Sequence, residues 1–176
     1  MTYIYFIGFM GSGKSTIARL ISQRLAIPFI DIDNEIEFQQ KRKIVDIFQE
    51  DGEEVFRLYE TKVLKEITDK PLISTGGGVV EKNENINYMK QNGIIIYLKT
   101  SFSEISSRLA HDHSRPLWKD DTNKQALFDK RIKLYNQIAD FIVDGDKLTL
   151  QEQVNEIIKY IRIKRIINVK DKHNSL

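Results

Sequence analysis

Five short apolar segments alternate along the chain with longer segments in which apolar side chains recur every three or four residues. Such runs predict buried strands, and the longer period predicts amphipathic helices. Strands are expected at residues 3–7, 28–33, 71–75, 93–98 and 140–144. Helices are expected to begin near residue 14 and at residue 34, and to cover 53–68, 84–91, 101–109, 123–138 and 149–163. This alternation predicts an α/β fold, in which helices flank both faces of a five-stranded parallel sheet.

The first turn, Gly8-Phe9-Met10-Gly11-Ser12-Gly13-Lys14-Ser15, has the pattern G-x-x-x-x-G-K-S between a predicted strand and a predicted helix. Its glycines let the backbone curl so that successive N–H groups point at an anion, and the start of the helix adds a positive dipole end. Lys14 is expected to reach the outer phosphates and Ser15 to ligate Mg²⁺. Four specified positions in this context disfavour a chance glycine turn, so we expect a nucleoside triphosphate site.

Asp31 and Asp33 close the second predicted strand. Side chains two apart on a strand share a face, and ligands of open α/β sheets bind at the carboxyl ends of the strands. The alternative is that either aspartate only caps the following helix. The third strand, 71–75, has no acidic residue of the kind that often holds Mg²⁺ in phosphate-loop enzymes, which leaves Asp31 as the candidate.

Two further patterns each allow two interpretations. Glu53, Arg57 and Glu60 form one helical stripe, which is either a solvated salt-bridge face or an arginine held between carboxylates to bind an anion. The triplet Gly76-Gly77-Gly78 follows the third strand and marks either a close approach to the backbone or a flexible turn. Parallel strands bring the phosphate loop, the aspartate pair and the triplet to the same edge of the sheet.

The segment Ala110 to Asp121 is polar and aperiodic, and loops of this length are often lids. Arg115 precedes a proline and is therefore expected to be extended. Its two histidines lack a nearby third ligand, which disfavours a metal site there.

Composition narrows the function classes. The 176 residues suit one domain, and a net charge of +2 disfavours nucleic-acid binding driven by bulk charge. The absence of cysteine excludes disulfides, thiolate catalysis and zinc–sulfur sites, and it fits an intracellular protein. The first residues are expected to form a core strand and not a signal peptide, and no apolar run approaches the length of a membrane helix.

Several of these segments, taken in order, resemble the shikimate kinase family over nearly the whole chain, from Ile4 to Ile161. The matching residues are the loop Gly8–Ser15, the Asp31-Ile32-Asp33 pair, the run Gly52–Glu60, the triplet Gly76–Gly78, Arg115-Pro116-Leu117, and Arg131 with Tyr135 four residues on.

The resemblance implies a three-layer P-loop kinase fold in a single domain at 1–163, with a helical substrate-binding segment at about 34–61, a lid at about 110–123 and a polar basic tail at 164–176. It also implies transfer of the γ-phosphate of ATP to the 3-hydroxyl of shikimate, in the route to aromatic amino acids. ATP and shikimate are the implied partners and Mg²⁺ the implied cofactor. A cytoplasmic monomer that binds neither nucleic acid nor membrane is expected.

The resemblance further assigns roles to individual residues. Asp33, which would hold the ring hydroxyls and accept a proton, is implied to act in catalysis with Lys14 and Arg115. The implied ATP contacts are Gly11, Ser12, Gly13, Lys14, Ser15, Thr16, Arg108 against the adenine, and Arg115 of the lid. The implied shikimate contacts are Asp33, Gly76, Gly77, Gly78 and the carboxylate clamp Arg57 with Arg131. Ser15 and Asp31 are implied to hold the metal.

One position departs from the family pattern. Members often carry an arginine shortly after the fifth strand, where this chain has Gly145-Asp146-Lys147-Leu148. Either Lys147 substitutes for that arginine or the contact is absent. Two other functions stay open: another small-molecule kinase, acting on gluconate or a nucleoside monophosphate, and a nucleotide-binding module without catalysis.

Overall fold

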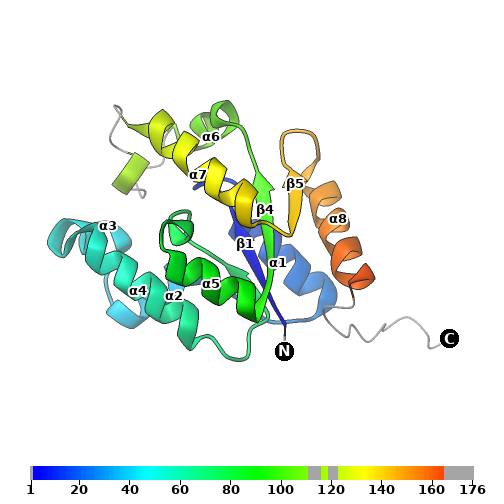
Figure 1. Ribbon diagram of the computed structural model, residues 1–176, viewed down its shortest axis with the longest axis horizontal. Coiled ribbons are helices and arrows are strands. Elements are labelled where there is room, and N and C mark those ends of the chain that lie inside the picture. Colours follow the sequence, from blue (N-terminus) through cyan, green and yellow to red (C-terminus); the bar gives the residue numbers. More distant parts are fainter. Residues whose placement is uncertain (1, 111–115, 119–122, 165–176) are drawn as a thin grey trace.

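The computed structural model describes residues 2–110, 116–118 and 123–164. Its five strands form one parallel sheet in the order β2-β3-β1-β4-β5 (Figure 1). The strands are β1 Tyr3–Ile7, β2 Phe29–Asp31, β3 Leu72–Ser74, β4 Gly93–Lys99 and β5 Phe141–Asp144. The predicted α/β class and five-stranded parallel sheet are therefore confirmed.

Helices cover both faces of this sheet. They are α1 Lys14–Leu25, α2 Ile32–Gln40, α3 Ile44–Glu50, α4 Gly52–Glu66, α5 Asn83–Asn92, α6 Phe102–Leu109, α7 Lys124–Ile138 and α8 Leu150–Ile163, with short 3₁₀ turns η1 Val79–Glu81 and η2 Pro116–Trp118. The ends of the predicted helices agree with these bounds to within two residues. The short helix α3 carries no clear sequence pattern and was not predicted.

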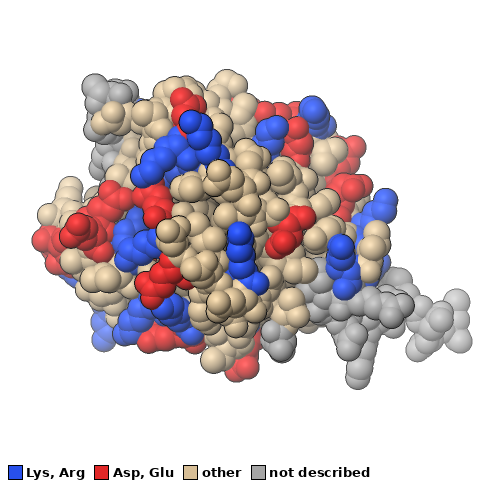
Figure 2. Space-filling model, viewed as in Figure 1, with Lys and Arg blue, Asp and Glu red and all other residues tan. Residues whose placement is uncertain are grey.

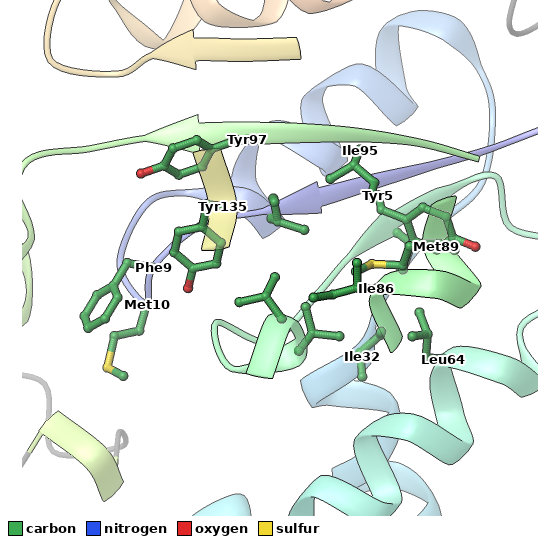
Figure 3. Packing of buried hydrophobic residues seen from close by; sticks show 14 of the residues in the cluster. Tyr5, Phe9, Met10, Ile32, Leu64, Ile86, Met89, Ile95, Tyr97 and Tyr135 are labelled. Atoms are coloured by element: carbon green, nitrogen blue, oxygen red, sulfur yellow. The ribbon is translucent and has the colours of Figure 1, made fainter. Parts of the chain in front are cut away.

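The alternation of side chains along β1 divides the core into two parts. Ile4 and Phe6 pack against α1 and α8 on one face, whereas Tyr5 and Ile7 point to the other face. Figure 3 shows Tyr5 on that second face, together with Ile95 of β4 and Met89 of α5. Burial on both faces explains why the sequences of β1 and β4 are continuously apolar and do not alternate between apolar and polar residues.

The second strand is shorter than predicted. It ends at Asp31, and Asp33 lies in the first turn of α2, so the expectation that both side chains share one face of a strand is wrong. The cause is local, because the Asp31 carboxylate accepts a hydrogen bond from the Asn34 N–H at 3.1 Å and so starts the helix early. The capping role is therefore confirmed for Asp31.

Two other helices also begin at side-chain caps. Ser101 accepts from the Glu104 N–H at 3.3 Å and caps α6. Thr149 and Glu152 form a capping box at the start of α8. Among the described residues, no helix is both long and apolar enough to cross a membrane.

Candidate active site

The phosphate loop joins β1 to α1 and holds its lysine against its own backbone. Gly13 precedes the helix with φ near 90°, a left-handed conformation that glycine adopts at little cost. The Lys14 ammonium donates to the carbonyls of Gly8 at 2.8 Å and Phe9 at 3.0 Å. The first residues of α1, including the buried Lys14, line the same cleft, where the amino end of a helix favours an anion.

Three oxygen-bearing side chains meet beneath the loop. The Ser15 hydroxyl donates to the Asp31 carboxylate and lies 3.1 Å from the Ser74 hydroxyl. Asp31 and Ser74 are paired in register at the ends of β2 and β3, which explains how residues far apart in the sequence converge here. Hydroxyl and carboxylate oxygens are the ligands that suit Mg²⁺. Among the described residues, no group of three or more His, Cys, Asp or Glu side chains could hold a metal ion, so an ion here would complete its shell with phosphate and water oxygens.

The glycine triplet is a packed segment. A Cβ on Gly76 would collide with the Glu60 carboxylate and lie 3.1 Å from Asp33 Oδ1, and a Cβ on Gly78 would overlap the Arg57 guanidinium. The carbonyl of Gly77 accepts a 2.5 Å hydrogen bond from the Tyr135 hydroxyl. The close-approach interpretation therefore holds, and the flexible-turn interpretation is wrong.

Arg57 lies at the buried side of α4. Its guanidinium donates to Glu60 at 2.9 Å and to Glu53 at 3.1 Å, and the residue is only 7% exposed. Glu60 is 0% exposed, and burial raises the pKa of its carboxyl although the charge of Arg57 opposes this. Glu53 is exposed, but the other two members of the stripe are buried, and the arginine is fixed by carboxylates.

Arg131 comes from the opposite side of the pocket, on α7. It is 1% exposed, its Nε donates to Glu81 at 3.1 Å, and its guanidinium lies 5.8 Å from the ring centre of Phe9. Burial raises the pKa of the Glu81 carboxyl, but the charges of Arg131 and Lys130 outweigh it and leave the pKa below its ordinary value. Sequence reasoning missed Glu81, because nothing in its local pattern points to a partner 50 positions away.

Two hollows meet at Asp33. The smaller, here called the acid pocket, contains both buried arginines. It is lined by Met10, Asp33, Ile44, Phe48, Phe56, Arg57, Gly76, Gly77, Gly78, Leu117 and Arg131. The larger, here called the phosphate cleft, runs along the loop from Met10 to Ile17 and past Asp31. Met10, Asp33, Ile44 and Gly77 line both, so Asp33 is one of the residues at which the two hollows join.

The far end of the phosphate cleft lies between α6 and the turn after β5. Arg108 lines it and donates to the Gly11 carbonyl at 3.1 Å, and Leu148 and Gln153 line it from the other side. Lys147 is not among its lining residues; its side chain is 80% exposed and pairs with Asp144 at 3.6 Å. In this structure, therefore, the Lys147 ammonium faces Asp144 and not the phosphate cleft.

Some predicted residues cannot be placed. The residues outside the described part of the chain include Arg115, both histidines of its segment, most of the expected lid and the tail from residue 165. The other predicted site residues border one or both hollows: Gly11 to Thr16, Asp31, Asp33, Arg57, Gly76 to Gly78, Arg108 and Arg131. Figure 2 shows basic and acidic side chains interspersed over the face in view, in contrast to the paired buried charges of the acid pocket.

Comparisons with known proteins cover most of the chain. The sequence profile of the family described as "Shikimate kinase" matches residues 10–162. A shikimate kinase from Persephonella marina is 41% identical over 92% of this chain and 100% of its own length. One from Staphylococcus haemolyticus is 44% identical over 90% of this chain and 93% of its own.

Solved structures give the same relationship. Shikimate kinase from Acinetobacter baumannii in complex with shikimate superposes with a TM-score of 0.87, at 32% identity over 95% of this chain and 96% of that one. The enzyme from Aquifex aeolicus gives a TM-score of 0.81 at 37% identity, over 93% and 98% of the two chains. A deoxyadenosine kinase from M. mycoides, at 18% identity and a TM-score of 0.62, shares the fold alone. With most of its length matched by one family profile and by relatives above 40% identity, the chain belongs to the shikimate kinase family.

Proposed function

We propose that this chain transfers the γ-phosphate of ATP to the 3-hydroxyl of shikimate, giving shikimate 3-phosphate and ADP, as a step toward chorismate and the aromatic amino acids. The observation that carries the proposal is the position of Asp33, at the junction of the acid pocket and the phosphate cleft. Phosphoryl transfer requires the acceptor hydroxyl and the donor phosphate to meet at such a junction.

The acid pocket suits a small hydroxylated carboxylic acid. Arg57 and Arg131 approach it from different helices, and a guanidinium matches a carboxylate through two parallel hydrogen bonds. Both are already held by carboxylates, so little side-chain entropy is lost when the acid binds. Because the glycine triplet has no side chains, the Arg57 guanidinium and the Glu60 carboxylate can lie directly against its backbone at the edge of this pocket.

Asp33 is assigned to the hydroxyl side of the reaction. Its carboxylate would accept hydrogen bonds from the ring hydroxyls and take the proton of the 3-hydroxyl as the new P–O bond forms. The Asp33→Asn variant tests this role, because asparagine can orient a hydroxyl but cannot take a proton from it.

The phosphate cleft supplies charge and backbone donors for ATP. The N–H groups from Gly11 to Thr16 would hold phosphate oxygens, and Lys14 would neutralise charge on the transferred group. Ser15 and Asp31 would hold Mg²⁺, directly or through water, and the bound ion supplies electrostatic stabilisation of the phosphates. Arg108 is assigned to the adenine, and Arg115 to the phosphates on lid closure.

A panel assay tests the proposal against its nearest rivals. Purified protein with ATP and Mg²⁺ is given shikimate, gluconate or a nucleoside monophosphate, and ADP release is followed by a coupled assay. We expect turnover with shikimate far above that with the other acceptors. Preferred turnover of gluconate or a nucleotide would replace the substrate, and ATP binding without turnover of any acceptor would indicate a non-catalytic module.

The assembly state and location belong to the same proposal. A monomer is the expected assembly, and the described residues of this chain line both hollows by themselves. A cytoplasmic location fits the use of ATP and the absence of cysteine from the sequence. Light scattering coupled to gel filtration and cell fractionation test these two expectations.

A further inference from the structure

We propose that Glu81 is a positioning residue for substrate binding, which acts by fixing the Arg131 guanidinium in the acid pocket. The inference deepens the proposed function, on which it rests. Glu81 is the last residue of η1, and η1 follows the glycine triplet directly. It therefore connects the wall of the pocket to the helix that supplies the arginine.

The contact uses one specific edge of the arginine. Glu81 Oε1 lies 3.1 Å from Arg131 Nε, so the carboxylate holds the guanidinium at its base. The Nη2 nitrogen of the same group is buried and has no hydrogen-bond partner among the described residues. An arginine anchored through Nε can still offer its terminal nitrogens to a carboxylate ligand. Arg131 itself lines the acid pocket. Its Nη2 nitrogen can therefore donate to the carboxylate of a ligand bound there.

The surroundings keep Glu81 charged and in place. Arg131 is 1% exposed and Glu81 has a side chain that is 19% exposed, so solvent screens this pair far less than a surface pair. Lys130 lies 3.4 Å from the same carboxylate oxygen. The Glu81 N–H donates to the Gly78 carbonyl at 3.0 Å, which ties the carboxylate to the triplet. The pKa of Glu81 is lowered by these cations, which agrees with a carboxylate that stays ionised.

A second bond from α7 reinforces the arrangement. Tyr135 lies one turn after Arg131, and its hydroxyl donates to the Gly77 carbonyl at 2.5 Å. Arg131 and Tyr135 thus hold α7 to the segment from Gly77 to Glu81 at two points. Without Glu81, the Tyr135 bond would still hold the helix, but the long Arg131 side chain would lose the contact that selects its rotamer. The expected consequence is weaker binding of the acid substrate, with the fold and the ATP site unchanged.

The test is a kinetic comparison of Glu81→Ala, Glu81→Gln and the matched control Glu84→Ala. Glu84 is a nearby glutamate, 57% exposed, that pairs with Lys65 on the surface. We expect Glu81→Ala to raise the KM for shikimate roughly tenfold, with the KM for ATP and the melting temperature close to those of the wild type. Glu81→Gln keeps an oxygen acceptor and should recover part of the loss, and Glu84→Ala should leave all three quantities unchanged.

A double-mutant cycle with Arg131→Lys shows whether Glu81 acts through the arginine. Lysine lacks the Nε–H group that Glu81 binds in Arg131. We therefore expect Glu81→Ala to raise the KM for shikimate less than twofold in the Arg131→Lys background. Full additivity, an unchanged KM in Glu81→Ala, or a lowered KM would overturn the inference. If the wild type itself fails to phosphorylate shikimate, the proposed function fails instead, so the two failures are distinct.

Discussion

Replacing Arg57 by alanine separates the folding role of the buried ion pair from its binding role. The variant leaves the Glu60 carboxyl, which is 0% exposed, without its 2.9 Å partner. Removing one member of a buried pair typically costs about 3–5 kcal/mol of the free energy of unfolding. For a chain of this size, that corresponds to a fall in melting temperature of about 6–20 °C.

The pH dependence of this loss has a definite sign. Burial raises the pKa of Glu60, and the charge of Arg57 opposes the increase, so the pKa rises further in Arg57→Ala. A carboxyl whose pKa is higher in the folded than in the unfolded state favours folding when it is protonated. That contribution is fully present below the ordinary pKa of glutamate and is lost as the pH rises through the raised value. The destabilisation by Arg57→Ala should therefore be larger at pH 8 than at pH 5.

A double variant isolates the binding role. Arg57→Met with Glu60→Leu replaces both charged groups by apolar side chains of similar volume, and such replacements of buried pairs are often neutral for stability. We expect the double variant to recover most of the lost stability and still bind shikimate at least about tenfold more weakly, because a charge-assisted pair is missing. ATP affinity should stay within a few fold of the wild type, because the phosphate cleft does not include Arg57.

The measurements are urea unfolding at two pH values and calorimetric titration with shikimate and with an ATP analogue. Wild-type stability of Arg57→Ala at both pH values would refute the argument from burial. Wild-type shikimate affinity of the double variant would remove Arg57 from the binding site, whatever its effect on folding. Equal losses for shikimate and ATP would indicate a general folding defect.

Three further variants test other parts of the site. Asp33→Asn should largely abolish turnover in the coupled assay while the dissociation constant for ATP changes only a few fold; wild-type rates would exclude proton transfer to Asp33. Asp31→Asn keeps a good helix cap, so the melting temperature should hold while the Mg²⁺ concentration for half-maximal activity rises; an unchanged Mg²⁺ titration would remove Asp31 from the metal site. Gly78→Ala should displace the Arg57 guanidinium and raise the KM for shikimate more than the KM for ATP; equal effects on both would contradict the close-packing argument.

Much of the architecture was predictable because its determinants are local. Continuous apolar runs indicate that β1 and β4 are buried on both faces. The three-to-four-residue apolar repeat of α8 indicates a helix that is buried on one face. The glycine loop between a strand and a helix was equally readable, since its function depends on the backbone of eight consecutive residues.

Local capping decided where the second strand ends, which was predicted incorrectly. A period of two fits 28–33 as a strand, but Asp31 turns its carboxylate to the Asn34 N–H and ends the strand there. Over so few residues, the pattern of apolar and polar side chains does not show whether an aspartate will continue a strand or cap a helix. The consequence is functional, because Asp33 reaches the junction of the two hollows from a helix and not from the sheet.

By itself, the sequence determined the order of strands and helices, the phosphate loop and, through its resemblance to a family, the candidate residues of the acid pocket. Only the tertiary structure decided which carboxylates hold the two arginines. Glu60 is three residues from Arg57 and could be suspected from helical spacing, whereas Glu81 reaches Arg131 across 50 residues. The pairing of Glu81 with Arg131 depends on how η1 and α7 pack together, and local patterns in the sequence do not predict that contact.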